Sequence, residues 1–290
     1  GTSPVTALSV GTTGQLLVGV TGTDPAFGSS ASADFAFTSN LRVGATAPSV
    51  PFDLNVQKST VGGIVELEIQ NTANTNVASR AIIGIVTGNA AGDPFLTYNV
   101  APVTSFSTGI DNSDSDKYKL SASNTLGTTD VMISTTAGEV TMPLQPAFMA
   151  YQASAAANVS GTGTAYTLGT TVDLTEVFDQ NADFDPTSGV FTAPVTGRYS
   201  FGLNPYWNTL IAASGFVNQI TTSNQTFTNQ IVRTASTADQ SNFTAVLCDM
   251  DAADTCTFVV AVSGEGADTA DLFGQAASPR YTFCYGKLEA

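Results

Sequence analysis

The chain has 290 residues, with 9 Lys and Arg against 24 Asp and Glu and no His, so its formal net charge is -15. The absence of histidine excludes Ser-His-Asp and Cys-His nucleophiles, imidazole metal ligands and imidazole proton shuttles. Because so negative a chain would repel a phosphate backbone, we expect no nucleic-acid partner. Hydrophobic residues make up 42% of the chain, which is enough for a packed core, and three cysteines are too few for a disulfide scaffold or an all-cysteine zinc site.

No apolar run in the sequence approaches the roughly 18 to 20 residues that span a membrane. The N-terminus also lacks a basic segment followed by an apolar one. We therefore expect no membrane partner. An ordinary domain has roughly 100 to 200 residues, so the length fits one large domain or two to three smaller modules.

Residues 1–62 are expected to form an extended stalk or linker, or strands that pair with other copies of the chain. Glycine, threonine and proline interrupt short apolar pieces at 11–15 and 23–25, and residues 29–33 are nearly all small. Such a segment has too little apolar material for a compact core of its own.

Residues 63–145 are predicted to form a β-rich module. Apolar and polar residues alternate over 64–70, turn residues follow, and a β-branched run at 81–87 completes a predicted hairpin. Further strands are expected at three places, 95–100, 117–121 and 130–134. No stretch has a helical period over ten residues or more, so the sequence predicts an all-β fold. Prolines at 143 and 146 disfavour continuation of a strand ladder and mark the next boundary.

A specific spacing of residues begins after position 173. Asp179 is followed after four residues by Phe184, after six more by Phe191, and after five more by the sequence GRYSF at 197–201. This spacing resembles the signature of the complement-1q and tumour-necrosis-factor jelly roll. Apolar segments at 146–151, 245–260 and 281–288 resemble the first strand, a later hairpin and the closing strand of that family.

The resemblance covers about residues 146–290 and implies a C-terminal jelly-roll β-sandwich head. Two features depart from the family: Asp173 stands where the pattern opens with an aromatic residue, and no Gly-X-Y repeat supplies a collagen stalk. Physically, Tyr199 and Phe201 are two residues apart and share one face of a strand. We interpret them, with Phe184 and Phe191, as core aromatics.

The N-terminal half has a second resemblance. Residues 8–19, 109–120 and 138–143 resemble modules of bacteriophage tail fibres and related viral surface fibres. Together the two resemblances imply a homotrimeric, non-enzymatic fibre or spike protein on a virion surface or in an extracellular filament. Its head would attach to a host-surface receptor or glycan, and its N-terminal segment would contact other virion or filament subunits. A trimer would also satisfy open sheet edges and the linker-like N-terminus.

Two alternatives to attachment remain open. The chain could be a purely structural subunit of a filament or virion, with a head that only trimerises and docks. It could also be a fibre-borne glycosidase or depolymerase, which needs a pair of carboxyl groups. Glu176, Asp179, Asp183 and Asp185 are candidates for such a pair. We assign no catalytic residue, because spacing does not give the separation of these groups.

Candidate receptor contacts lie just after the strand that contains Tyr199. Tyr206, Trp207 and Asn208 combine two aromatic rings with an amide in one short stretch, and aromatic residues are enriched at binding hot spots. The alternative for Trp207 is a place in the core or in a trimer interface.

Two aspartate clusters are candidate calcium ligands. Each lies in one turn, and they consist of Asp111, Asp114 and Asp116, and of Asp249, Asp251 and Asp254. Clustered carboxylates suit Ca²⁺, which takes six to eight oxygen ligands, although neither run matches an EF-hand loop. The alternative is a solvated acidic turn, and we expect no other cofactor.

Cys248 and Cys256 flank the second acidic turn. If their strands pair in register, the Cα atoms could approach the ~5.5 Å that a disulfide requires. Cys284 is expected to be a small buried hydrophobe in the closing strand.

Overall fold

The computed structural model describes residues 16–18, 26–28, 69–71, 80–87, 92–100 and 102–289. Within them the regular elements are strands and one 3-10 helix, η1 (Asn112–Asp114), which confirms the all-β prediction. The chain divides into two compact units, Gly1–Ile82 and Ile83–Ala290. None of the helices found in the described ranges has the length and apolar character needed to cross a membrane.

In the first unit, β1 (Leu16–Val18) pairs antiparallel with β2 (Ala26–Gly28). The rest of the predicted stalk, the fibre-like stretch at 8–19 apart from β1, and most of the strand predicted at 64–70 lie outside the described residues. The predicted strand at 81–87 is not formed: these residues carry no strand and are exposed.

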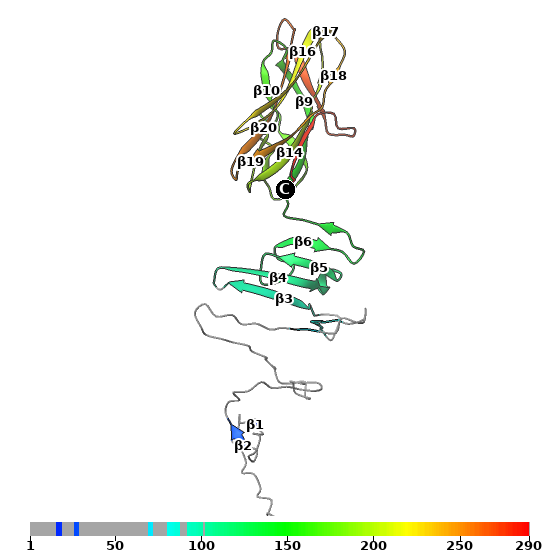
Figure 1. Ribbon diagram of the computed structural model, residues 1–290. Coiled ribbons are helices and arrows are strands. Elements are labelled where there is room, and N and C mark those ends of the chain that lie inside the picture. Colours follow the sequence, from blue (N-terminus) through cyan, green and yellow to red (C-terminus); the bar gives the residue numbers. More distant parts are fainter. Residues whose placement is uncertain are drawn as a thin grey trace, which may run out of the picture. The chain divides into compact units, whose positions relative to one another are not determined.

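The second unit begins with a five-stranded antiparallel meander, hereafter the module (Figure 1). Its strands follow one another in chain order: β3 (Phe95–Val100), β4 (Thr104–Asp111), β5 (Lys117–Ser121), β6 (Asp130–Ser134) and β7 (Val140–Thr141). The predicted strands at 95–100, 117–121 and 130–134 are confirmed with these bounds.

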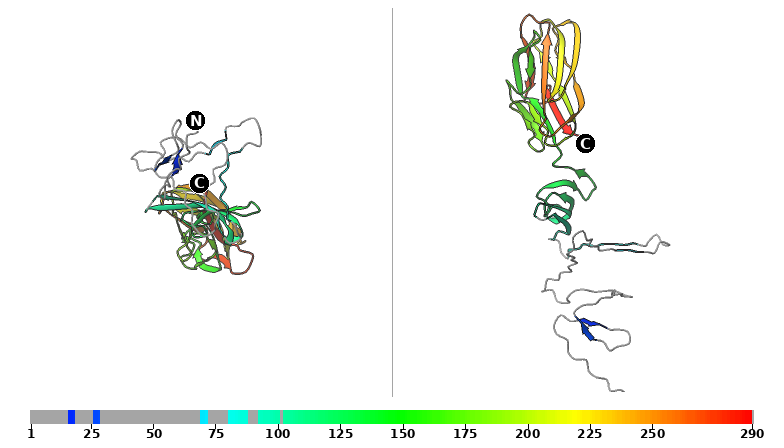
Figure 2. Two further views of the ribbon diagram at one scale, coloured as in Figure 1. Left: turned by 90° about the horizontal axis from the view of Figure 1, so that it is seen from below. Right: turned by 60° about the vertical axis from the view of Figure 1, so that its left-hand side comes forward.

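The head contains the remaining strands in three antiparallel sheets (Figures 1 and 2). The first sheet has the order β11 (Leu174–Asp179), β8 (Ala147–Gln152), β22 (Phe283–Leu288), β14 (Gly197–Asn204) and β19 (Thr244–Met250). The second has the order β12 (Phe184–Asp185), β13 (Val190–Thr192), β20 (Thr255–Ser263), β16 (Ala213–Thr222) and β17 (Thr226–Ser236), with β10 (Ala165–Thr167) also on β20. A smaller third sheet has the order β18 (Gln240–Ser241), β15 (Tyr206–Asn208), β21 (Ala270–Gln275) and β9 (Ser154–Ser160).

The strand order of the head is that of a jelly roll. The chain passes from β13 in the second sheet to β14 in the first, and from β19 in the first sheet back to β20 in the second. Many neighbours within a sheet are therefore distant in sequence, as when β14 lies between β19 and β22. This arrangement confirms the predicted C-terminal jelly-roll β-sandwich.

Aromatic side chains fill the space between the two larger sheets. The ring of Phe148 stacks on Phe184 with centroids 4.2 Å apart, and Phe191 lies 5.4 Å from both Phe148 and Phe201. Tyr199 is fully buried and its hydroxyl donates to the Val195 carbonyl at 2.7 Å. All four aromatics predicted from the spacing thus lie in the core.

The core position of Phe201 generates a stability prediction. Replacement of Phe201 by Ala removes a fully buried ring, and we expect a loss of about 3 to 5 kcal/mol in the free energy of unfolding. Val232 on β17 is 75% exposed, so Val232→Ala should change stability by less than about 0.5 kcal/mol. Urea denaturation at one matched protein concentration measures both, and similar losses in the two variants would contradict the assignment of Phe201 to the core.

Candidate functional site

The outer side of the first sheet carries a row of uncharged residues in direct lateral register. Phe178 on β11 pairs with Met149 on β8, Met149 pairs with Tyr285 on β22, Tyr285 pairs with Gly202 on β14, and Gly202 pairs with Ala245 on β19. Because side chains alternate along a strand, this row points away from the aromatic core. The row crosses all five strands of the sheet without a charged side chain.

Glycine at position 202 lets an aromatic ring lie flat on this row. A Cβ atom at Gly202 would come within 2.3 to 2.7 Å of ring atoms of Tyr285, so any larger residue would displace that ring. The ring of Phe243 stacks on Tyr285 with centroids 6.3 Å apart. At the margins, Phe178, Phe243 and Leu247 are 45%, 50% and 60% exposed. We call the row, together with Phe243 and Leu247, the head face.

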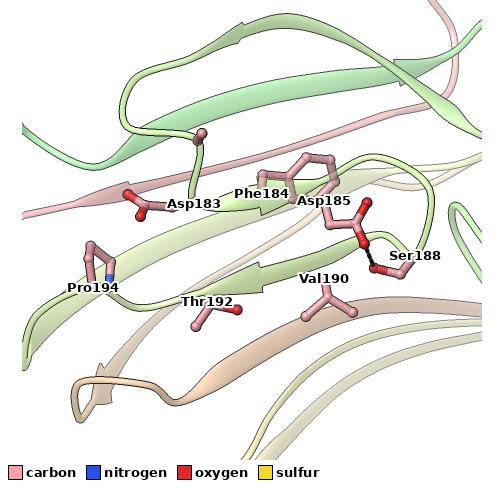
Figure 3. A pocket seen from close by; sticks show the side chains of 8 residues that line it. Asp183, Phe184, Asp185, Ser188, Val190, Thr192 and Pro194 are labelled. Carbon is pink, nitrogen blue, oxygen red and sulfur yellow. Dashed lines mark hydrogen bonds between the residues drawn. The ribbon is translucent and has the colours of Figure 1, made fainter.

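A second candidate is a surface hollow of about 520 Å³ beside β12 and β13 (Figure 3). Burial, together with the negative charge of Asp179, raises the pKa of Asp183. Hydrogen bonds from Ser188 and Thr187 hold the pKa of Asp185 below its usual value. Two carboxyl groups with pKa values moved in opposite directions are the pattern expected of an acid and a base in catalysis.

The positions of the two carboxyl groups do not match those of a catalytic acid and base. Figure 3 shows the carboxyl groups of Asp183 and Asp185 at opposite ends of the hollow. Asp185 accepts hydrogen bonds from the hydroxyls of Ser188 at 2.6 Å and Thr187 at 2.8 Å, which closes its own turn. Asp179 accepts from the backbone N–H of Phe184 at 3.0 Å. Asp179 and Asp185 are thus turn-forming groups, whereas one carboxylate oxygen of Asp183 is buried without a hydrogen-bond partner. The fourth candidate, Glu176, is an exposed residue of β11.

The first predicted calcium cluster surrounds a lysine. The Lys119 ammonium lies 2.8 Å from carboxylate oxygens of Asp111 and Asp114 and 3.1 Å from Asp130. The lysine side chain is only 4% exposed. Burial alone would lower the pKa of Lys119, but the three carboxylates outweigh burial and raise it. Asp116, the third predicted ligand, is exposed and accepts from the Asn112 amide at 2.7 Å.

The second predicted cluster is spread over a turn. Asp249 is 85% exposed and pairs with Arg198 at 3.2 Å. Asp254 accepts from the Asp251 backbone N–H at 2.8 Å and from the Asn224 amide at 2.6 Å.

Neither cluster is arranged as a calcium site, and calcium binding by these aspartates stays a prediction. No group of three or more acidic or cysteine residues in the described part of the chain is arranged to hold a metal ion. Donors of the protein itself already hold carboxylate oxygens of Asp111, Asp114 and Asp254. The two cations involved, Lys119 and Arg198, come from neighbouring strands, a pairing that sequence spacing alone did not reveal.

The three predicted receptor residues differ from one another in their exposure to solvent. Trp207 is fully buried, so the prediction that it contacts a receptor is wrong, and the core alternative is confirmed. Its strand β15 lies between β18 and β21, which places the indole inside the head. Tyr206 and Asn208 are partly exposed, and their role in binding stays a prediction. The Tyr206 hydroxyl donates to the Asp239 carboxylate at 3.0 Å.

The predicted disulfide between Cys248 and Cys256 is not formed, and all three cysteines are free and buried. Cys248 lies on β19, which pairs with β14, whereas Cys256 lies on β20 in the opposite sheet. The required pairing of the two strands is therefore absent. Burial raises the pKa of Cys248 to about 11 and also raises the pKa of Cys284, whose predicted burial is confirmed.

Comparisons with known proteins give matches to solved structures alone. No protein-family model matches the chain, and no curated protein sequence matches it either. Among solved structures, the globular domain of zebrafish complement 1qA protein is 15% identical, with a TM-score of 0.34 over 50% of this chain and 98% of that domain. Murine APRIL is 13% identical, with a TM-score of 0.34 over 50% of this chain and 99% of that chain. Eiger TNF from S. frugiperda is 14% identical, with a TM-score of 0.32 over 50% of this chain and 94% of that chain.

The ion cluster around Lys119 generates a prediction that has a matched control. Lys119→Met leaves the buried Asp111 without its cation, and we expect a loss of about 3 kcal/mol in the free energy of unfolding at pH 7. Lys117 pairs with Asp114 alone and is 32% exposed, so Lys117→Met should have a much smaller effect. Thermal and urea unfolding measure both variants. Equal losses in the free energy of unfolding would show that the ion cluster around Lys119 is not a buried network.

The same cluster sets a pH dependence. Lys119 and Ser113 hold the pKa of Asp111 below the usual 3.8, and Lys117 with Lys119 lowers the pKa of Asp114 to about 2. A carboxyl with a lowered pKa in the folded state contributes stability above its unfolded pKa, and this contribution is lost as the pH falls. We expect the wild type to lose stability from about pH 4 down to about pH 2, and the gap between wild type and Lys119→Met to narrow over that range. A constant gap, measured by urea unfolding across this range, would contradict this linkage.

Proposed function

We propose that the protein is a non-enzymatic homotrimeric fibre or spike protein of a virion surface or an extracellular filament. In this proposal the jelly-roll head attaches to a receptor or glycan on a host-cell surface. The observation that carries the proposal is the head face, an uncharged aromatic row that crosses a complete sheet and includes the flat contact between Gly202 and Tyr285.

The head face supports self-association for reasons of charge and of shape. Copies of a chain with a net charge of -15 repel one another over most of their surface, so an uncharged face is the place where they can meet. Aromatic side chains with a flat backbone beside them provide apolar area at low cost in conformational entropy. A closed symmetric assembly would bury this face in every copy, and three copies are the arrangement that we propose.

Oligomeric state tests this part of the proposal. Light scattering on a size-exclusion column should give three times 29.8 kDa for the wild type. Tyr285→Arg places a charge in the head face and should shift the mass toward one chain. Val232→Arg adds the same charge on a strand of the opposite sheet, where the side chain is already 75% exposed, and should keep the trimer mass. A stable wild-type monomer would remove the main physical support for a fibre.

Attachment would involve the partly exposed aromatic residues near β15. The Tyr206 ring lies 5.8 Å from Phe273 and 4.8 Å from Tyr281, measured between centroids. Its hydroxyl is held by Asp239, which is exposed. Aromatic faces beside a carboxylate acceptor suit the apolar face and the hydroxyl groups of a sugar, and this chemistry supports a glycan as the ligand.

A printed array of cell-surface glycans tests the attachment role. We expect the wild type to bind at least one class of glycan, and Asp239→Asn to weaken that binding at least tenfold because the carboxylate acceptor is lost. Asp173→Asn makes the same chemical change at an exposed residue elsewhere on the head and should bind like the wild type. If Asp239→Asn binds glycans as the wild type does, the surface around Tyr206 and Asp239 is not the attachment site.

A purely structural role is the second candidate, and one observation favours it. Trp207, the single tryptophan of the chain and one of the three predicted receptor residues, is fully buried and does not offer its ring to a partner. In this case the head would only trimerise, and residues 1–62 would join other virion or filament subunits. Electron microscopy that shows filaments of the purified chain, together with no glycan binding, would favour this role over attachment.

A further inference from the structure

The two faces of the module differ in chemistry. The register places Tyr98 opposite Phe106, and Ile110 opposite Tyr118, on the same side of the sheet. With two further residues of β3 they form what we call the module face: Leu96, Tyr98, Val100, Phe106, Ile110 and Tyr118. These six side chains are between 40% and 64% exposed. This side of the sheet is therefore apolar and open to solvent.

The other side of the same sheet is polar, and it is closed over β4 and β5. Ser107, Asp111, Lys119 and Ser121 all lie there and are no more than 4% exposed. The loop between β5 and β6 covers them: Gly127 lies against the Asp111 carboxylate, and the Thr129 backbone N–H donates to the Ser121 hydroxyl at 3.3 Å. The chain thus covers the β4 and β5 part of its polar face with its own residues, whereas the apolar face is uncovered among the described residues.

The exposed apolar area of the module face is large enough for a protein–protein contact. Six large apolar side chains, each about half exposed, present on the order of 600 Å² per copy. A standard protein interface buries about 800 Å² per partner, and exposed apolar patches of several hundred Å² mark interaction sites. None of the six residues is charged, and the polar Thr108 hydroxyl beside them already bonds to the Tyr118 hydroxyl at 2.7 Å.

We propose that the module face is a self-association surface in its own right, packed against the same face of other copies of this chain. This inference rests on the homotrimer of the proposed function, because heads that trimerise hold three identical modules at a high effective concentration. The negative charge of each copy makes an uncharged face the favourable place for contact. Assembly would then be encoded in two separate places, the head face and the module face.

Cysteine cross-linking of the full chain tests this proposal. Val100 lies on the module face, whereas its neighbour Asn99 is exposed on the opposite face of the same strand. The three native cysteines are buried, so an introduced surface thiol is the reactive one. With a short bismaleimide at low protein concentration, Val100→Cys should give covalent dimers at least fivefold faster than Asn99→Cys. Adding Tyr98→Asp and Phe106→Asp to Val100→Cys should reduce cross-linking to the rate of the control.

Light scattering measures the mass of each variant, so that a missing module interface can be distinguished from a missing homotrimer. A trimer mass with equal cross-linking of Val100→Cys and Asn99→Cys would overturn the module interface and leave the head trimer intact. A monomer mass in the wild type would overturn both. If Val100→Cys is protected from a monofunctional maleimide without forming cross-links, the module face is covered within its own chain, and the proposal is wrong.

Discussion

The stacking of aromatic rings between the two larger sheets is the constraint on which the head depends. Phe148 from the first sheet stacks on Phe184 from the second at 4.2 Å, and Phe191 from the second lies 5.4 Å from Phe201 in the first. Because the side-chain period of a strand is two, fixing these rings inward also fixes which residues point outward. The outward position of the row through Tyr285 is thus a geometric consequence of the core.

The parts of the fold that depend on local patterns could be predicted from the sequence. The spacing from Phe184 to Phe201 gave the core aromatics, and the alternation of apolar residues gave the module strands. The errors arose where the answer depends on which distant strands are neighbours. Trp207 is buried because β21 pairs with β15 from over sixty residues away, and Cys248 and Cys256 are separated because consecutive strands enter opposite sheets. Periodicity gives the faces of a strand and does not give its partners.

Two cations, the buried Lys119 and the exposed Arg198, pair with part of the acidic charge of the chain. Lys119 gathers three carboxylates at about 3 Å and Arg198 pairs with Asp249, so both aspartate clusters serve the chain that contains them. The remaining negative charge keeps copies apart except where charge is absent. The head face and the module face are two such surfaces, and they lie on different sheets of the second unit.

The free thiols of the head have a consequence for where the protein can fold. Cys248, Cys256 and Cys284 are all buried, and burial raises the pKa of each thiol, so little of the reactive thiolate exists at neutral pH. The stability of the head therefore comes from packing and not from a covalent cross-link. Its native state requires no oxidation step, and burial protects the three thiols from oxidation once the head has folded.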